Sequence, residues 1–158
     1  MTQSTPPRFI ADAMLGRLAR WLRVLGYDTA YRAHIADAEL VQQARAEGRV
    51  VLTRDRALPR QWRLERYLLL HAEAPLAQVR QVVEAFGLGW QERLFSRCLC
   101  CNEELQAAPG QDVAARVPSY VRQQQQRFLI CPHCRRIYWE GTHVAHMRRL
   151  LAATLPPA

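Results

Sequence analysis

The sequence contains no lysine, so all 22 of its basic residues are arginine. It also lacks any apolar run of about 18 residues, the length that a membrane-spanning helix requires. The first residues, MTQSTPPRF, have neither the basic nor the apolar region of a signal peptide. These absences exclude a membrane protein and favour a cytoplasmic one. A chain of 158 residues suffices for one medium domain and a small appendage.

The formal net charge is +8, and both halves of the chain contribute to it. The part ending at Glu92 has 13 arginines against 10 acids, and the remainder has 9 arginines against 4 acids, which gives +3 and +5. A genomic preference for arginine codons explains the choice of arginine over lysine, but it does not explain the positive sign. Because guanidinium groups bind phosphates bidentately, the composition favours a nucleic-acid ligand.

Short apolar runs alternate along the chain with segments of helical periodicity. The apolar runs do not alternate with polar residues, as is typical of strands that are covered on both faces. In the first periodic segment the leucines share one side, and Arg17, Arg20 and Arg23 fall on the opposite side. Strands are predicted at 9–11, 28–33, 49–55 and 66–71, and helices at 14–25, 35–48, 56–62 and 76–86. This order predicts an α/β fold with a parallel sheet flanked by helices.

All five cysteines lie between residues 98 and 134, and this change in composition predicts a domain boundary. We expect one domain at 8–92 and a second at 93–155. Two C-x-x-C pairs, Cys98 with Cys101 and Cys131 with Cys134, predict one tetrahedral zinc site. Disulfides are the alternative, but the cytoplasm disfavours them, and a redox C-x-x-C motif would not need a second pair.

Four thiolates around zinc make a closed structural site with no open position for chemistry. A domain of this size has a small core, so the metal is expected to stabilise it. Cys100 is left over, either as a spare ligand or as a small buried residue. Three histidines could each replace a thiolate but are expected to be polar surface or core residues, namely His133, His143 and His146.

Three aspartates lie at the predicted ends of strands and helices. Asp12 follows the first strand, Asp55 follows the third strand, and Asp37 opens the helix that leads into the third strand. Because ligands bind at the carboxyl ends of strands in such sheets, these side chains could converge on one Mg²⁺ or Mn²⁺ site. The alternative is structural: Asp12 and Asp37 are good helix caps, and Asp55 could cap a helix or pair with a neighbouring arginine.

Four motifs occur in order, FIADAMLGRLARWLRVLGYDT, GRVVLTRDRAL, RCLCCNEEL and YWEGTH. On these motifs, from about Arg8 to Met147, the chain resembles the Mut-seven C-terminal RNase domain family. The resemblance implies a PIN-like nuclease domain, a parallel sheet flanked by helices, followed by a small zinc ribbon. It also implies that Asp12, Asp37 and Asp55 bind the catalytic metal. The four cysteines of the two pairs would be the ribbon's ligands.

The resemblance therefore implies a metal-dependent ribonuclease that hydrolyses RNA phosphodiester bonds and leaves 5′-phosphate ends. PIN nucleases generally use about four acids, and Glu39, the nearest candidate for a fourth, points away from Asp37 on a helix. We expect Arg17, Arg20 and Arg56 to contact RNA phosphates, with solvated surface arginines as the alternative, and the basic ribbon to help bind RNA. Tyr138 and Trp139 are expected to belong to the ribbon's small core. The alternative is a non-catalytic RNA-binding or ribosome-associated module with a degenerate PIN-like domain.

Overall fold

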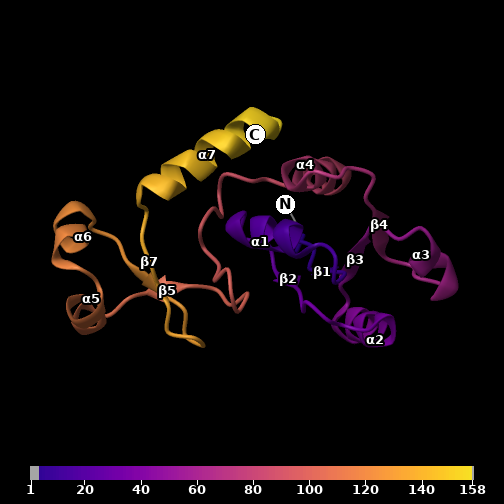
Figure 1. Cartoon of the computed structure of the whole chain (residues 1–158), viewed down its shortest axis with the longest axis horizontal. Helices are drawn as coiled ribbons and strands as arrows, with labels where there is room; N and C mark the ends of the chain where they lie inside the picture. The colour runs from indigo at the N-terminus through magenta and orange to yellow at the C-terminus, as the bar shows by residue number, and fades with distance from the viewer. Residues whose placement is uncertain (1–3, 158) are drawn as a thin grey trace.

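The N-terminal part of the chain forms a four-stranded parallel sheet with helices on both faces (Figure 1). The structure is a computed structural model and describes residues 4–157. The strands, in the spatial order β2-β1-β3-β4, are β1 (Phe9–Ala11), β2 (Thr29–Ala30), β3 (Val50–Thr53) and β4 (Tyr67–Leu69). The helices of this part are α1 (Gly16–Val24), α2 (Asp37–Glu47), α3 (Ala57–Gln61) and α4 (Pro75–Phe86). The predicted alternation of strands and helices is confirmed.

The two central strands are buried on both faces, as their apolar runs predicted. Phe9 pairs in register with Val50, and Ile10 pairs with Val51. Because successive side chains of a strand point to opposite faces, Phe9 and Val50 join a core with α1 and α4. Ile10 and Val51 join a second core, which is completed by residues of α2 and α3. The helices therefore cover the sheet from both sides.

The last turn of α1 is buried more completely than the sequence predicted. Arg17 and Arg20 are exposed, but Arg23, predicted on the same outer side, is only 7% exposed. Arg23 is buried on this outer side because the segment after residue 92 covers this end of the helix, where the Phe95 amide donates to the Val24 carbonyl at 2.8 Å. Gly26 permits this approach, since it has φ +89° and a Cβ there would lie 2.4 Å from a backbone oxygen of that segment.

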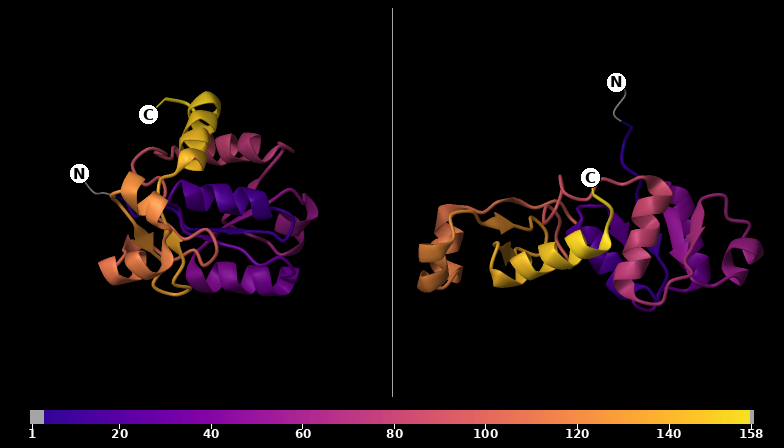
Figure 2. Two further views of the ribbon diagram at one scale, coloured as in Figure 1. Left: turned by 60° about the vertical axis from the view of Figure 1, so that its left-hand side comes forward. Right: turned by 90° about the horizontal axis from the view of Figure 1, so that it is seen from above.

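The C-terminal part contains a small antiparallel sheet that carries the cysteines. Its strands follow the order β5 (Gln106–Ala107), β6 (Leu129–Ile130) and β7 (Ile137–Tyr138). Between β5 and β6 lie two short helices, α5 (Gly110–Arg116) and α6 (Ser119–Gln124), which account for the long spacing between the cysteine pairs. Figure 2 shows this part projecting from one end of the parallel sheet. The predicted fold class, a parallel α/β sheet followed by a small ribbon with a four-cysteine cluster, is confirmed.

The last helix, α7 (Thr142–Thr154), returns from the ribbon to the first part of the chain (Figure 1). It packs against α4, and Leu151 is fully buried in the same core as Phe9. The Trp90 indole donates to the Pro156 carbonyl at 2.8 Å and fixes the segment that follows α7. The division of the chain near residue 92 stays a prediction, and the C-terminal helix connects the two parts across it. No helix within residues 4–157 has the length and apolarity needed to cross a membrane.

Candidate functional site

Asp12 and Asp55 lie just beyond the carboxyl ends of the two central strands. Asp12 follows β1 and Asp55 comes two residues after β3, and these strands are parallel neighbours. Thr53, which is fully buried, connects the two acids: its hydroxyl donates to Asp12 Oδ2 at 2.6 Å and accepts the Asp55 amide at 3.0 Å. Sequence reasoning missed Thr53, although a hydroxyl residue as the last residue of a buried strand, two positions before an acid, was a visible signal. Thr53 thus joins the carboxylate of Asp12 to the backbone of Asp55.

Neither Asp12 nor Asp37 caps a helix. The N-cap of α1 is Leu15 and that of α2 is Ala36, and neither helix has a side-chain cap. Asp12 Oδ1 instead accepts the Met14 amide at 2.9 Å within the turn before α1. Asp55 comes closest to the structural alternative, because its Oδ1 accepts the Ala57 amide at 2.8 Å at the start of α3.

Asp37 stands on another element, at the start of α2. It is exposed in the first turn of α2, a helix that packs against β1 and β3. Within residues 4–157, the only His, Cys, Asp or Glu group of three or more whose ligand atoms all lie within 4.8 Å of one another is a cysteine group. The three aspartates therefore do not form a preassembled ligand set of that size. Glu39 forms an exposed ion pair with Arg32 at 3.1 Å.

The three arginines predicted to contact phosphates are exposed. Arg17 and Arg20 lie on α1, which begins four residues after Asp12, and Arg56 follows Asp55 directly. None of them takes part in the eight ion pairs found among the described residues. The side chain of Met14, beside Asp12, is 88% exposed. The rim around the acids therefore offers cationic and apolar groups to a ligand.

The second candidate site is the cysteine cluster. The sulfurs of Cys98, Cys101, Cys131 and Cys134 lie within 4.8 Å of one another. The Cys98 and Cys134 sulfurs are 3.8 Å apart. Four sulfurs at about 2.3 Å from a tetrahedral zinc ion would be separated by about 3.8 Å, so this spacing fits zinc. Cys100 and the three histidines lie outside the group, and the Cys100 sulfur contacts Arg136 Nη1 at 2.7 Å.

Hydrogen bonds around the cluster favour the thiolate form of one ligand. Burial raises the pKa of Cys98, but hydrogen bonds from the Tyr138 hydroxyl at 3.2 Å and from the amides of Cys101 and Cys100 outweigh burial and lower the pKa to about 6. Zinc binds the thiolate, so this group is ready to bind metal at neutral pH. The amides of Cys101 and Cys134 each face the first sulfur of their own pair, at 3.4 and 3.5 Å.

The first cysteine pair is attached directly to the parallel sheet. Arg23 of α1 donates to the carbonyls of Thr29 at 3.0 Å, Leu99 at 2.9 Å and Cys100 at 3.3 Å. Asn102 accepts the Thr29 amide at 2.9 Å and donates to Asp28 Oδ1 at 2.6 Å. Since β2 is an edge strand, these contacts continue its hydrogen bonding into the ribbon. The cluster and the sheet that carries the acids therefore form one connected structure.

Comparison with known proteins adds one match. A family model described as the Mut7-C RNAse domain matches residues 7–151. Curated proteins and solved structures, compared in the same way, yielded no match. The matched range includes the acids, the arginines on α1 and all four clustered cysteines.

Proposed function

The chain belongs to the Mut7-C RNase domain family, and from this premise we propose that it is a metal-dependent ribonuclease whose acidic site is built on Asp12, Asp37 and Asp55. The observation that carries the proposal is the hydrogen-bonded chain Asp12–Thr53–Asp55 at the ends of two parallel strands. Crevices at the carboxyl ends of parallel strands are the usual ligand sites of open α/β sheets. The substrate class follows from the family and from the net charge of +8.

The donor set suits Mg²⁺ or Mn²⁺, because hard cations prefer oxygen ligands. A carboxylate has about four lone-pair sites, and Asp12 uses one on each oxygen, so both oxygens keep a free lone pair for a cation. Asp12 and Asp55 would hold the metal, and Asp37 would complete the set from α2. When bound, such an ion activates water for attack on phosphorus and neutralises charge on the phosphodiester.

The chain's own groups orient and bind. Thr53 fixes the Asp12 carboxylate, because its hydroxyl is itself held by the Asp55 amide. Arg17, Arg20 and Arg56 bind phosphates of the RNA strand as charged donors. We expect 5′-phosphate and 3′-hydroxyl ends.

The ribbon has a structural role in this proposal. Zinc held by Cys98, Cys101, Cys131 and Cys134 stabilises a small sheet that has little core of its own. Hydrogen bonds of Arg23 and Asn102 then hold this part of the ribbon against the edge of the parallel sheet. The excess of positive charge after residue 92 helps to bind RNA.

The test is cleavage of end-labelled single-stranded RNA in Mn²⁺ by the wild type, Asp12→Asn and Asp55→Asn. Asp112→Asn is the matched control, since Asp112 lies in α5 and pairs with Arg135 at 3.5 Å. Both site variants should lose cleavage by at least about a hundredfold, the scale expected for removal of a metal ligand, while the control retains it. Zinc content should be equal in all four proteins. Thr53→Val should lower the rate less than the aspartate variants do, and Thr53→Ser should restore it.

One observation favours the second candidate, a non-catalytic RNA-binding module. The three aspartates do not gather within 4.8 Å in the described part of the chain, and Glu39 is engaged with Arg32. Equal background cleavage by all variants, with tight RNA binding and no uptake of Mn²⁺, would support this candidate over the nuclease. Mn²⁺ uptake that is lost in Asp12→Asn would support the nuclease.

A further inference from the structure

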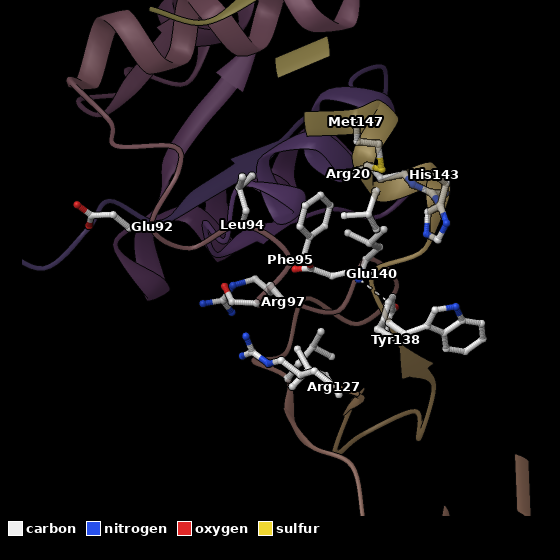
Figure 3. A pocket seen from close by; sticks show the side chains of 16 residues that line it. Arg20, Glu92, Leu94, Phe95, Arg97, Arg127, Tyr138, Glu140, His143 and Met147 are labelled. Carbon is white, nitrogen blue, oxygen red and sulfur yellow. Dashed lines mark hydrogen bonds between the residues drawn. The ribbon is translucent and has the colours of Figure 1, made fainter. Parts of the chain in front are cut away.

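A cavity of about 330 Å³ lies between the parallel-sheet part and the ribbon (Figure 3). Four segments that are distant in sequence line it: α1 through Arg20, the connecting segment through Phe95, the residues before β6 through Arg127, and the residues after β7 through Trp139. Residues of α7 close another side, where Figure 3 shows His143 and Met147. The cavity exists only because the ribbon and α7 fold back against α1.

Apolar side chains and aromatic rings line most of the cavity, and arginines stand around it. The Trp139 ring packs against Phe128, with 6.1 Å between ring centroids. The Tyr138 ring is held by hydrogen bonds, because its hydroxyl lies 3.2 Å from the Cys98 sulfur and accepts the Leu99 amide at 3.2 Å. Rigid aromatic surfaces of this kind are the usual platforms for unstacked nucleobases.

The charges around the cavity leave cations free. Arg20 and Arg127 are exposed and belong to none of the ion pairs among the described residues. Arg97 is occupied, since it donates to the Asn102 carbonyl at 2.6 Å and pairs with an acid. Of the two acids that line the cavity, Glu140 is neutralised by Arg148 at 2.9 Å. The cavity therefore combines an apolar interior with free guanidinium groups, which suits an aromatic ligand that carries phosphates.

We propose that this cavity binds one unstacked nucleobase of single-stranded RNA, with Trp139 as a stacking surface and with Arg20 and Arg127 on the flanking phosphates. The proposal rests on the proposed ribonuclease function, for which it names the substrate-binding site. Its volume lies at the lower end of the range for small-molecule sites, about 300–1,000 Å³. A base inside a duplex is paired and stacked and does not reach such a site.

The position of the cavity connects it with the acids. Arg17 and Arg20 are three residues apart on α1 and so lie on the same side of the helix, about 4.5 Å apart along its axis. Arg17 is nearer to Asp12, and Arg20 lines the cavity. An RNA strand bound along these two arginines would lead from the cavity to the carboxyl ends of β1 and β3. The bound base would lie a few nucleotides away from the scissile phosphate.

The test is binding of fluorescein-labelled RNA to the full, zinc-loaded chain carrying Asp12→Asn, measured by anisotropy without divalent cations other than the bound zinc. A 12-nucleotide single strand is compared with a blunt duplex of the same length. Arg127→Gln and Trp139→Leu are added separately, and the matched control is Arg149→Gln. Arg149 is exposed on α7 and lies two positions after Met147, hence on the side of the helix away from the cavity. Arg127 is exposed, so its substitution leaves the fold intact.

Each cavity variant should weaken single-strand binding about tenfold, within the range measured for loss of one base–aromatic contact. Duplex binding should change by less than about twofold, and Arg149→Gln should behave like the parent. A 5-iodouridine in the single strand should crosslink to the peptide that contains Trp139. Equal single-strand affinities for both cavity variants and the control would overturn the proposal. Because no Mg²⁺ or Mn²⁺ is present, weakened binding would support the cavity even if the wild type cut no RNA, and cleavage with unchanged binding would refute the cavity alone.

Discussion

Replacing Arg23 by glutamine should destabilise the whole protein, although the helical pattern places this residue with two exposed arginines. The residue is 7% exposed, and its guanidinium donates to three carbonyls, of Thr29, Leu99 and Cys100. Hydrogen bonds from charged donors contribute about 1.5–3 kcal/mol each. The shorter amide of glutamine would satisfy one acceptor at most, which leaves the other carbonyls without this donor.

The charge of Arg23 works against part of this stabilisation. Burial lowers the pKa of Arg23, which means that the buried position disfavours the cation, while the nearby thiols of Cys98 and Cys100 favour it. Removing the guanidinium thus relieves a desolvation cost. With two hydrogen bonds lost and this cost relieved, the free energy of unfolding should fall by about 2–4 kcal/mol. Two of the acceptor carbonyls, of Leu99 and Cys100, lie between Cys98 and Cys101. The variant should therefore also lose zinc to a chelator faster.

Urea unfolding of the zinc-loaded protein measures the first effect, and a chromogenic zinc chelator measures the second. Arg20→Gln is the matched control: it removes the same group one turn earlier on α1, where the side chain is exposed, and should change stability by less than about 0.5 kcal/mol. If the two variants unfold at the same urea concentration, Arg23 does not connect the ribbon with the sheet, and the reasoning from its hydrogen bonds is wrong.

Further predictions concern α7, the metal and the acid range. Leu151→Ala should lower the free energy of unfolding by about 2–5 kcal/mol in urea, because a fully buried leucine leaves a cavity, whereas the exposed Arg149→Ala should not. Removing zinc should make the α5–α6 segment sensitive to protease and leave the parallel sheet resistant, and an equally resistant ribbon would refute a structural metal. Burial raises the pKa of Asp28, but bonds to Arg49 and Asn102 outweigh it and lower the pKa. A lowered native pKa stabilises the fold above the unfolded value of about 3.9, so in urea Asp28→Asn should cost about 1.5–3 kcal/mol at pH 7 and progressively less below pH 4.

The sequence was sufficient to predict the elements whose partners lie in the same sheet. Residues 9–11 and 50–53 are apolar at every position or nearly so, and this requires cover on both faces whatever the details of packing. The cysteine spacing likewise restricts the ribbon to one geometry, because each short turn aims two sulfurs at one point. Local pattern and final environment agree at these positions.

The features that were not predicted depend on contacts between distant segments. A helical pattern divides α1 into a face toward its own sheet and a face away from it. It does not indicate that the first cysteine pair of the ribbon covers the outer face at Arg23. The link through Thr53 depends on the register between β1 and β3, and the cavity depends on four segments meeting. Leu151 is buried with α4 because α7 packs back against the N-terminal part of the chain. The periodicity of a helix does not indicate which distant element it packs against.

The return of α7 has a consequence for the products of cleavage. Because the ribbon is attached to the parallel sheet both where the chain enters it, near Phe95, and where the chain leaves it, through α7, it cannot swing like a domain on a single linker. The distance between the proposed base-binding cavity and the acids is therefore constant. RNA held in the cavity would be cut at a uniform offset from the held base.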